Sequence, residues 1–325
     1  MSSKKKIYRA VIVGAGRIAS GFDTPSSQHV LTFAHALTKN SRVKLCGIMD
    51  INEVQGKKEA RKWKTPFYAD MNVMCDALKP DIVIIATPDA THLKILAQLL
   101  KKHPGIIICE KPVVSKQQDM EKAKILAEKN SVPIIVNFRR QFDETVADIR
   151  DRLSRGEYGS VLSANCLYTK GVLHNGTHMI DLARYFFGEM ISASAHFRVN
   201  DFPLGAPSLG GVATFERCPQ FYFMNGDERH FSVFEFEILT AKKRIRFTDE
   251  GLLCSMQDVV PDSLYKGYYV LGKPKIQKTK LWNALSRLTT HAVNVLDGKE
   301  KVISSLENTL KTEEACFRLL ENYHR

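Results

Sequence analysis

The run Ala10-Val11-Ile12-Val13-Gly14-Ala15-Gly16-Arg17-Ile18-Ala19 decides the fold of the first part of this 325-residue chain. Its four leading apolar residues predict a buried strand, and G-x-G-x-x-A is an accepted form of the dinucleotide-binding fingerprint. Gly14 permits a tight turn, Gly16 has no Cβ to keep a pyrophosphate from the backbone, and Ala19 lets the next helix pack closely. The N-terminus of that helix offers N–H groups to the phosphates. We therefore expect a dinucleotide site here.

An acidic residue at the end of the second predicted strand supports the same site. Asp50 follows Val43–Met49, and an acid at this place accepts hydrogen bonds from the adenosine ribose hydroxyls and repels a 2′-phosphate. Ile51 and Asn52 come next, so no arginine stands ready for that phosphate. The sequence predicts NAD rather than NADP.

The spacing between fingerprint and acid is longer than usual. Asp50 lies 31 residues after Ala19, whereas about 20 is common. The excess falls in residues 20–30 and indicates an insertion at the carboxyl edge of the first strand, where loops border the ligand crevice. Asp23 and His29 could face that crevice, although a surface loop without chemistry is the simpler interpretation.

The sequence changes character near residue 143. Before it, short β-branched runs alternate with amphipathic helical stretches, which predicts βαβ units around a parallel, doubly wound sheet. After it, strand-like runs follow one another with a single helix at 176–187, which predicts an α+β domain with a mainly antiparallel open sheet. We expect an α/β Rossmann domain over 1–142. A substrate-binding and oligomerisation domain should cover 143–325, with a C-terminal helix free to pack back on the first domain.

Composition narrows the class of protein. With 44% hydrophobic and 25% charged residues, the chain has an ordinary globular mixture. No apolar run approaches the roughly 20 residues that span a bilayer, and the first strand is too short for a signal peptide. The seven cysteines are scattered without a C-x-x-C pair, as expected for reduced, buried thiols in the cytoplasm. We expect no membrane partner and no metal.

The net charge of +12 raises the question of nucleic-acid binding. Acidic residues are interleaved almost everywhere, which argues against it. The exceptions are the Lys4–Lys6 tail and a second basic run, and each is either solvated surface or a means of attracting an anionic substrate. The second run consists of Lys266, Lys273, Lys275, Lys278 and Lys280.

Three further motifs give the chain a resemblance to a known family. Residues 86–92 read A-T-P-D-A-T-H, residues 109–112 read C-E-K-P, and residues 136–142 read V-N-F-R-R-Q-F. With the fingerprint, they resemble the glucose–fructose oxidoreductase and inositol dehydrogenase (Gfo/Idh/MocA) family, from residue 8 to about 190. The family has asparagine where this chain has Asp89.

The resemblance implies roles for several of these residues. In the family the lysine of E-K-P lies at the nicotinamide beside the substrate, a role that passes to Lys111. A lysine there can hydrogen-bond the reacting hydroxyl and stabilise a developing alkoxide. The cofactor-binding set implied is Gly14, Gly16, Arg17, Ile18, Asp50, Thr87, Pro88, His92, Glu110, Lys111 and Arg140.

A histidine-containing element in the second half carries the remaining chemistry. Residues 174–181 read H-N-G-T-H-M-I-D, and the family typically has D-x-G-x-H-x-x-D here. The family's general acid–base histidine matches His178, whose side-chain type titrates near neutral pH. The resemblance implies that Asn175, His178 and Asp181 bind substrate together with Lys111. His174 replaces the usual aspartate, so it acts as a substitute base, binds an anionic substrate group, or marks lost activity.

These observations predict an NAD-dependent oxidoreductase that transfers hydride between nicotinamide and a secondary hydroxyl or ketone. The substrate would be a sugar, nucleotide sugar or cyclitol. The alternative is a non-catalytic dinucleotide-binding regulator of the same fold, and a reductase of a planar double bond is a third possibility. The resemblance also implies a homodimer or homotetramer. We expect it to form on an uncovered apolar face of the sheet, with Phe234, Phe236 and Ile238 on that face.

Overall fold

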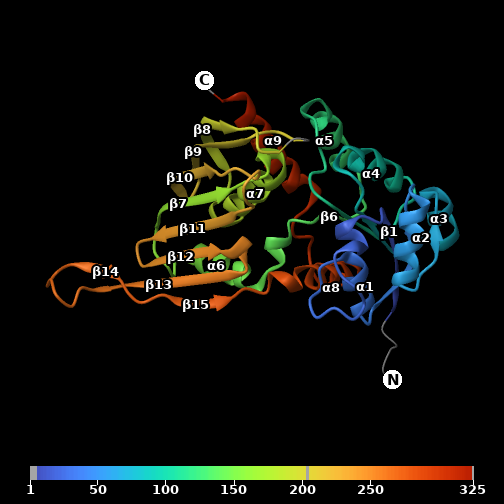
Figure 1. The fold of residues 1–325 in the computed structure, drawn as a ribbon, viewed down its shortest axis with the longest axis horizontal. Helices are drawn as coiled ribbons and strands as arrows, with labels where there is room; N and C mark the ends of the chain where they lie inside the picture. The colour runs from blue at the N-terminus through green and yellow to red at the C-terminus, as the bar shows by residue number, and fades with distance from the viewer. Residues whose placement is uncertain (1–5, 203–204, 324–325) are drawn as a thin grey trace. The chain divides into compact units, whose positions relative to one another are not determined.

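The computed structural model describes residues 6–202 and 205–323, which divide into two compact units. The first unit contains residues 6–142 and 282–310, and the second contains 143–281 and 311–323. Each has its own sheet and its own buried core (Figure 1), so each meets the description of a domain.

A six-stranded parallel sheet forms the centre of the first unit. Its order is β3-β2-β1-β4-β5-β6, and every neighbouring pair is parallel. The order reverses at β1, the kind of switch point at which open α/β sheets bind ligands. This confirms the predicted Rossmann fold. The strands are β1 (Tyr8–Val13), β2 (Val43–Met49), β3 (Phe67–Tyr68), β4 (Ile82–Ile85), β5 (Ile106–Cys109) and β6 (Ile134–Val136).

Burial on both faces explains the sequence of these strands. Parallel strands covered by helices on both sides need unbroken apolar runs, and every residue of β4 is at most 1% exposed. Several of the helices begin at a side-chain cap: Thr32, Asn52 and Asp70 each accept the backbone N–H three residues on. The helices and helical turns are η1 (Arg17–Gly21), α1 (Phe33–Lys39), α2 (Glu53–Lys62), α3 (Met71–Leu78), η2 (Asp89–Thr91), α4 (His92–Leu100), η3 (Gln117–Asp119), α5 (Met120–Lys129), η4 (Arg139–Phe142) and α8 (Ala284–Leu296).

The second unit contains a mixed, mainly antiparallel sheet, as predicted. Its order is β14-β13-β12-β11-β7-β10-β9-β8, with β15 also paired to β13, and the β7–β10 pair is parallel. The strands are β7 (Val161–Tyr168), β8 (Met190–Val199), β9 (Ser208–Phe215), β10 (Cys218–Asn225), β11 (Phe234–Thr240), β12 (Lys243–Thr248), β13 (Leu253–Pro261), β14 (Tyr269–Leu271) and β15 (Lys275–Lys278). The helical elements of this unit are α6 (Glu144–Ser154), η5 (Gly171–Asn175), α7 (Gly176–Phe187) and η6 (Asp249–Gly251). Two further elements cross the division between the units: η7 (Leu281–Asn283) and α9 (Leu306–Glu321).

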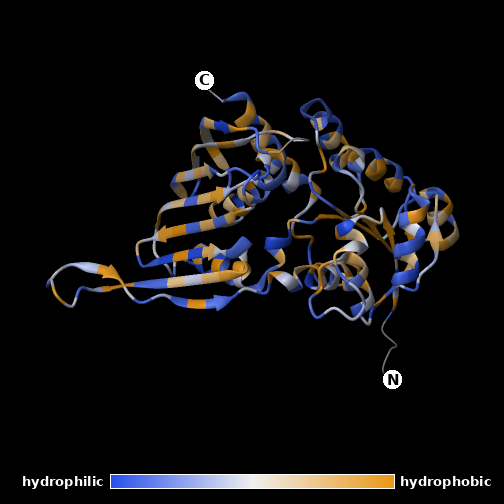
Figure 2. Cartoon of the chain, viewed as in Figure 1, coloured by the Kyte–Doolittle hydropathy of each residue, from blue (hydrophilic) through white to orange (hydrophobic). Residues whose placement is uncertain are grey.

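The expectation that Phe234, Phe236 and Ile238 lie on an uncovered face is wrong. All three are at most 1% exposed and belong to the core of the second unit. The ring of Phe236 packs 5.8 Å from Phe186 and 6.3 Å from Phe187 of α7. Figure 2 shows the alternation of hydrophilic and hydrophobic residues along this sheet. The alternation along a strand shows which residues share a face of the sheet. It does not show which of the two faces is buried, because that depends on where the helices pack.

A β-ribbon formed by β13, β14 and the loop between them extends from this sheet (Figure 1). Its large apolar side chains are exposed, with 83% for Leu264, 70% for Tyr268 and 71% for Tyr269. The second basic run noted in the sequence follows the same ribbon and is exposed as well, whereas Lys4 and Lys5 of the tail lie outside the described residues. Within the described residues, no helix has the length and apolarity needed to cross a membrane.

Candidate functional site

The fingerprint turn lies where three strands of the first unit end. Gly14 has a φ of +99°, its N–H donates to Met49 O at 2.7 Å, and a Cβ on it would lie 2.5 Å from Ala86 O. Both the backbone conformation and the space therefore require glycine. Gly16 is exposed, and a Cβ there would find Ala86 O at 3.8 Å as its only near neighbour, which leaves the outer side of the turn open.

The helix after the fingerprint differs from the prediction. The chain forms η1, a π-helical turn of five residues, and α1 begins only at Phe33. The insertion thus divides what is usually one helix. Arg17 is exposed and Ile18 half-buried, while Ala19 is fully buried. A phosphate at this turn would therefore meet the turn's backbone N–H groups rather than the end of a long helix.

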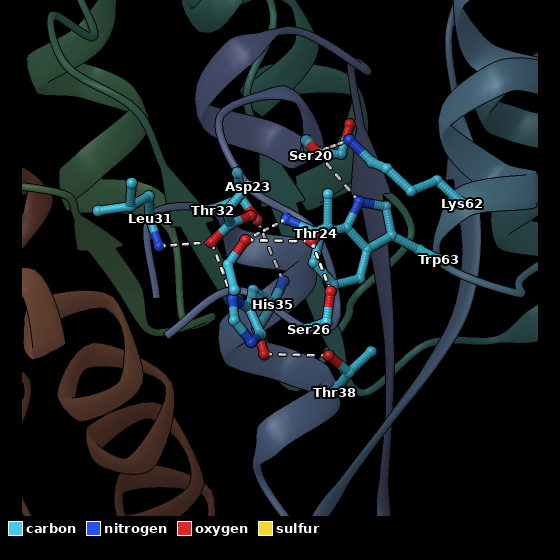
Figure 3. Close-up of polar contacts among 11 residues, drawn as sticks. Ser20, Asp23, Thr24, Ser26, Leu31, Thr32, His35, Thr38, Lys62 and Trp63 are labelled. Carbon is cyan, nitrogen blue, oxygen red and sulfur yellow. Dashed lines mark hydrogen bonds and ion pairs between the residues drawn. The ribbon is translucent and has the colours of Figure 1, made fainter. Parts of the chain in front are cut away.

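Asp23 closes the inserted loop instead of facing a crevice (Figure 3). Its carboxylate is 5% exposed and accepts hydrogen bonds from Leu31 N at 2.6 Å and Thr32 Oγ1 at 2.5 Å. His35 Nδ1 lies 2.8 Å from the same carboxylate. The ring of His29 lies 5.6 Å from that of Trp282. The loop is therefore an ordered structure with a buried carboxylate at its base.

Side chains from α2 and the residue after it hold the backbone of the fingerprint turn and of η1. The carbonyl of Ser20 accepts hydrogen bonds from Lys62 Nζ at 2.5 Å and Trp63 Nε1 at 3.0 Å (Figure 3). The amide of Gln55 donates to Ala15 O at 3.2 Å. No local pattern predicts these contacts, because the three residues lie about 40 positions further along the chain and belong to no motif.

Asp50 lies at the adenosine end expected for a dinucleotide. Its Oδ2 accepts the Ala15 N–H at 2.6 Å, and its Oδ1 accepts the Asn52 N–H at 2.7 Å. A carboxylate has about four lone-pair sites, so each oxygen keeps capacity for a further donor. The side chain is half-buried at the end of β2. It is thus fixed by the turn and still able to accept ribose hydroxyls.

His92 connects the two turns that follow β4 and β5. It is fully buried, and its Nδ1 and Nε2 each lie 2.7 Å from a backbone carbonyl, of Pro112 and Thr87 respectively. Pro88 is exposed and Thr87 half-buried beside it. The histidine of the A-T-P-D-A-T-H motif therefore fixes the position of the E-K-P turn.

The E-K-P turn places a buried lysine at the carboxyl end of β5. Lys111 is 8% exposed, and burial lowers its pKa from 10.5 to about 8, against the opposing charges of Glu110 and Asp89. Burial also raises the pKa of Glu110, whose carboxylate accepts Asn137 Nδ2 at 2.6 Å. Arg140 is buried nearby in η4, and its charge lowers the pKa of Lys111 further. The result is an amine that exchanges protons near neutral pH.

The histidine element belongs to the second unit, at the start of α7. His174 lies on η5, half-buried, with its ring stacked 5.2 Å from that of Phe202. Asn175 occupies the N-cap position of α7, and His178 is half-buried in the first turn. Asp181, 3% exposed, follows His178 by three residues on the same helix. The structure thus brings these four residues together on one short stretch.

A buried carboxylate that the sequence analysis missed holds this element. Asp201 is 1% exposed and accepts Lys170 N at 2.9 Å and Ser208 Oγ at 2.9 Å. Ser208 Oγ in turn accepts the N–H of Gly171 at 2.8 Å. Lys170 and Gly171 both have positive φ, at +69° and +70°. These contacts fix the turn that leads into His174, and no local motif points to Asp201.

The predicted residues therefore fall into two groups. The first unit gathers the fingerprint, Asp50 and the E-K-P turn at the carboxyl edge of one sheet, and the second unit carries the histidine element. In the described part of the chain, no three His, Cys, Asp or Glu side chains are grouped as metal ligands. A glycine turn at the carboxyl edge of an open α/β sheet is the arrangement typical of a dinucleotide-binding domain.

Comparison with known proteins identifies that domain. Residues 8–138 match the Gfo/Idh/MocA model, which describes an oxidoreductase family with an NAD-binding Rossmann fold. It is 25% identical over 212 residues to glucose-6-phosphate 3-dehydrogenase of Bacillus subtilis, covering 58% of this chain and 57% of that protein. It is 30% identical over 141 residues to inositol 2-dehydrogenase of Mycolicibacterium gilvum, covering 39% and 40%. The matched part thus spans about half the length of these relatives or less.

Solved structures extend the likeness in fold to the whole chain. A levoglucosan dehydrogenase in complex with NADH and levoglucosan superposes with a TM-score of 0.79 at 16% identity, covering 98% of this chain and 97% of that one. At this identity the match concerns the fold alone.

Proposed function

We propose that this protein is an NAD-dependent oxidoreductase that transfers hydride between nicotinamide and a secondary hydroxyl or ketone of a sugar, nucleotide sugar or cyclitol. The observation that carries the proposal is Lys111, a buried amine with a pKa lowered to about 8 at the carboxyl end of β5. It lies in the same unit as the fingerprint turn. Lysine is almost never fully buried unless it is paired, and perturbed pKa values gather at functional sites.

The residues present fit the cofactor. The side of Gly16 that faces away from the sheet is open, as a pyrophosphate at the turn requires. Asp50 is held with spare acceptor capacity at the adenosine end, and no arginine follows it to receive a 2′-phosphate. These features favour NAD over NADP. We propose that Arg17 and Ile18 contact the cofactor from the turn, with Thr87, Pro88, Glu110 and Arg140 toward the nicotinamide end and His92 holding the turns in place.

The chain's own residues would manage the proton and the charge. Bound NAD supplies the acceptor for the hydride that leaves the carbinol carbon as the alcohol becomes a ketone. Lys111 hydrogen-bonds the reacting hydroxyl and stabilises negative charge on its oxygen. The hydroxyl proton passes to His178 or to the neutral amine of Lys111. Asn175 and Asp181 would hold further hydroxyls, and His174 would take the place of the family's aspartate or bind an anionic group.

Relatives support the substrate class. The two curated relatives are named for glucose 6-phosphate and inositol, and a structure of similar fold contains levoglucosan. All are polyhydroxylated rings. The rival proposal, a non-catalytic regulator of the same fold, is favoured by the loss of the aspartate at His174 and opposed by the presence of both Lys111 and His178.

We also propose that the protein assembles into at least a dimer through the second unit. Four of the large apolar residues exposed in this unit lie on the β13–β14 ribbon, where Leu264, Tyr265, Tyr268 and Tyr269 are between 66% and 83% exposed. A ribbon of two strands with both faces in water is marginally stable by itself, and exposed apolar patches mark interaction sites.

A cytoplasmic location is part of the proposal, since all seven cysteines are free thiols.

A substrate panel tests the enzyme against the regulator. Nucleotide sugars, sugar phosphates and cyclitols are incubated with NAD while the absorbance of reduced nicotinamide is followed. We expect turnover on one class, and a loss of about 10²-fold or more in Lys111→Met and His178→Ala. Cofactor affinity should change little in both. Exposed residues of the same types, Lys116→Met and His230→Ala, serve as controls. If NAD binds but no hydroxyl or ketone reacts, the regulator is the better description.

A further inference from the structure

Asn137 occupies a fixed place beside the E-K-P turn. It is the first residue after β6, and its backbone N–H donates to Cys109 O at 2.9 Å. The residue is 4% exposed. Its position is therefore set by the β5–β6 ladder and does not depend on loop conformation.

The orientation of the Asn137 amide follows from its partner. Nδ2 donates to Glu110 Oε1 at 2.6 Å, and a carboxylate oxygen accepts but does not donate. The amino end of the amide must therefore face Glu110, which directs Oδ1 elsewhere. Oδ1 is shielded from solvent and accepts no hydrogen bond within the described part of the chain. Buried acceptors without a donor are rare and require an explanation.

The direction of the cofactor suggests which group supplies the donor. With the pyrophosphate at the turn after β1 and the adenosine at Asp50 after β2, a dinucleotide runs the other way across β4 toward β5 and β6. Neighbouring strands are about 4.8 Å apart, so Asn137 after β6 lies one strand beyond Lys111 after β5. The nicotinamide ribose comes before the ring along this path, and the ring's carboxamide comes last. The carboxamide also carries the N–H donors that Oδ1 lacks.

We propose that Asn137 Oδ1 accepts a hydrogen bond from the carboxamide of the nicotinamide, which makes Asn137 a positioning residue for the ring. The proposal rests on the function proposed above. Glu110 fixes the asparagine, and the asparagine fixes the rotation of the ring that accepts or gives the hydride. This series of hydrogen bonds, from Glu110 to Asn137 to the carboxamide, would thus select which face of the ring is turned toward Lys111.

Binding calorimetry with two cofactor analogues tests this contact without measuring turnover. In 3-acetylpyridine adenine dinucleotide a methyl group replaces the carboxamide NH2, and ADP-ribose lacks the nicotinamide altogether. The unmodified protein should bind the acetylpyridine analogue about three- to tenfold more weakly than NAD, the effect of one neutral hydrogen bond. In Asn137→Ala this preference should disappear, while ADP-ribose binding stays unchanged. Asn72→Ala, an exposed asparagine on α3, should keep the preference.

The outcomes separate the two proposals. Equal affinity of the unmodified protein for NAD and the acetylpyridine analogue overturns the carboxamide contact, whether or not Asn137→Ala folds. An unchanged preference in a variant that still binds ADP-ribose overturns the role of Asn137. If Asn137→Ala lowers the affinity for NAD and for the acetylpyridine analogue by the same factor, the partner of Oδ1 is a ribose hydroxyl, and the proposal is also overturned. Failure of the unmodified protein to bind NAD and ADP-ribose rejects the proposed function itself.

Discussion

Replacing Lys111 by methionine should make the protein more stable as it becomes inactive. Burial lowers the pKa of Lys111 from 10.5 to about 8, so the folded state binds the proton less tightly than the unfolded chain. One pKa unit corresponds to about 1.4 kcal/mol, which makes the cost of the buried ammonium about 3 kcal/mol at neutral pH. The loss of its attraction to Glu110 reduces the gain, but Glu110 can take up a proton because burial raises its pKa. We expect Lys111→Met to be about 1–3 kcal/mol more stable at pH 7.

The dependence on pH gives this prediction a specific signature. Between pH 8 and 10.5 the unfolded chain binds more protons at Lys111 than the folded protein does, so the stability of the unmodified protein rises there with pH. The advantage of the variant should shrink over that window and vanish above it. Urea unfolding at pH 7, 8, 9 and 10 measures the difference, with Lys116→Met as an exposed control that should show neither effect. A variant that is less stable at pH 7, or an advantage that does not depend on pH, would refute the assignment of a lowered pKa to Lys111.

Three further predictions follow from the two units. Asp50→Ala should lower the affinity for NAD about tenfold and reduce the protein's preference for NAD over NADP, because it removes the ribose acceptor and the contact with Ala15. Titration calorimetry measures both affinities, and tighter NADP binding by the unmodified protein would refute the choice of cofactor. His174→Ala should lower turnover and shift the pH profile, as expected of a stand-in for aspartate; a raised KM with unchanged turnover would assign it to an anionic substrate group. Light scattering at micromolar concentration should show at least a dimer. Tyr268→Lys should weaken the association of the protomers, whereas Val73→Lys, an exposed control on α3, should not. A monomer in the unmodified protein would contradict the assembly.

The local sequence was sufficient to predict the bounds of elements whose apolar residues follow a regular strand or helix pattern. The bounds of β2 and α7 agree with the predicted ranges, because unbroken apolar runs and helical periodicity are local signals. The strands β14 and β15 were not predicted, since every residue in them is exposed and none faces the core. The insertion predicted at residues 20–30 lies between η1 and α1, and the sequence did not show that only a five-residue turn would follow the fingerprint directly.

The sequence by itself determined the chemistry that motifs carry: a glycine turn after β1, an acid after β2, a lysine after β5 and a histidine in the first turn of α7. Only the tertiary structure showed what holds them. Gln55, Trp63 and Asn137 meet the turns across 27 to 43 positions of chain, and Asp201 meets Lys170 across 31. The structure also shows that the phenylalanines of β11 are buried in the core and that Asn137 Oδ1 is buried without a hydrogen-bond donor in the described part of the chain. Residue order fixes which groups are present, but burial and hydrogen-bond partners depend on segments that approach each other only when the sheets form.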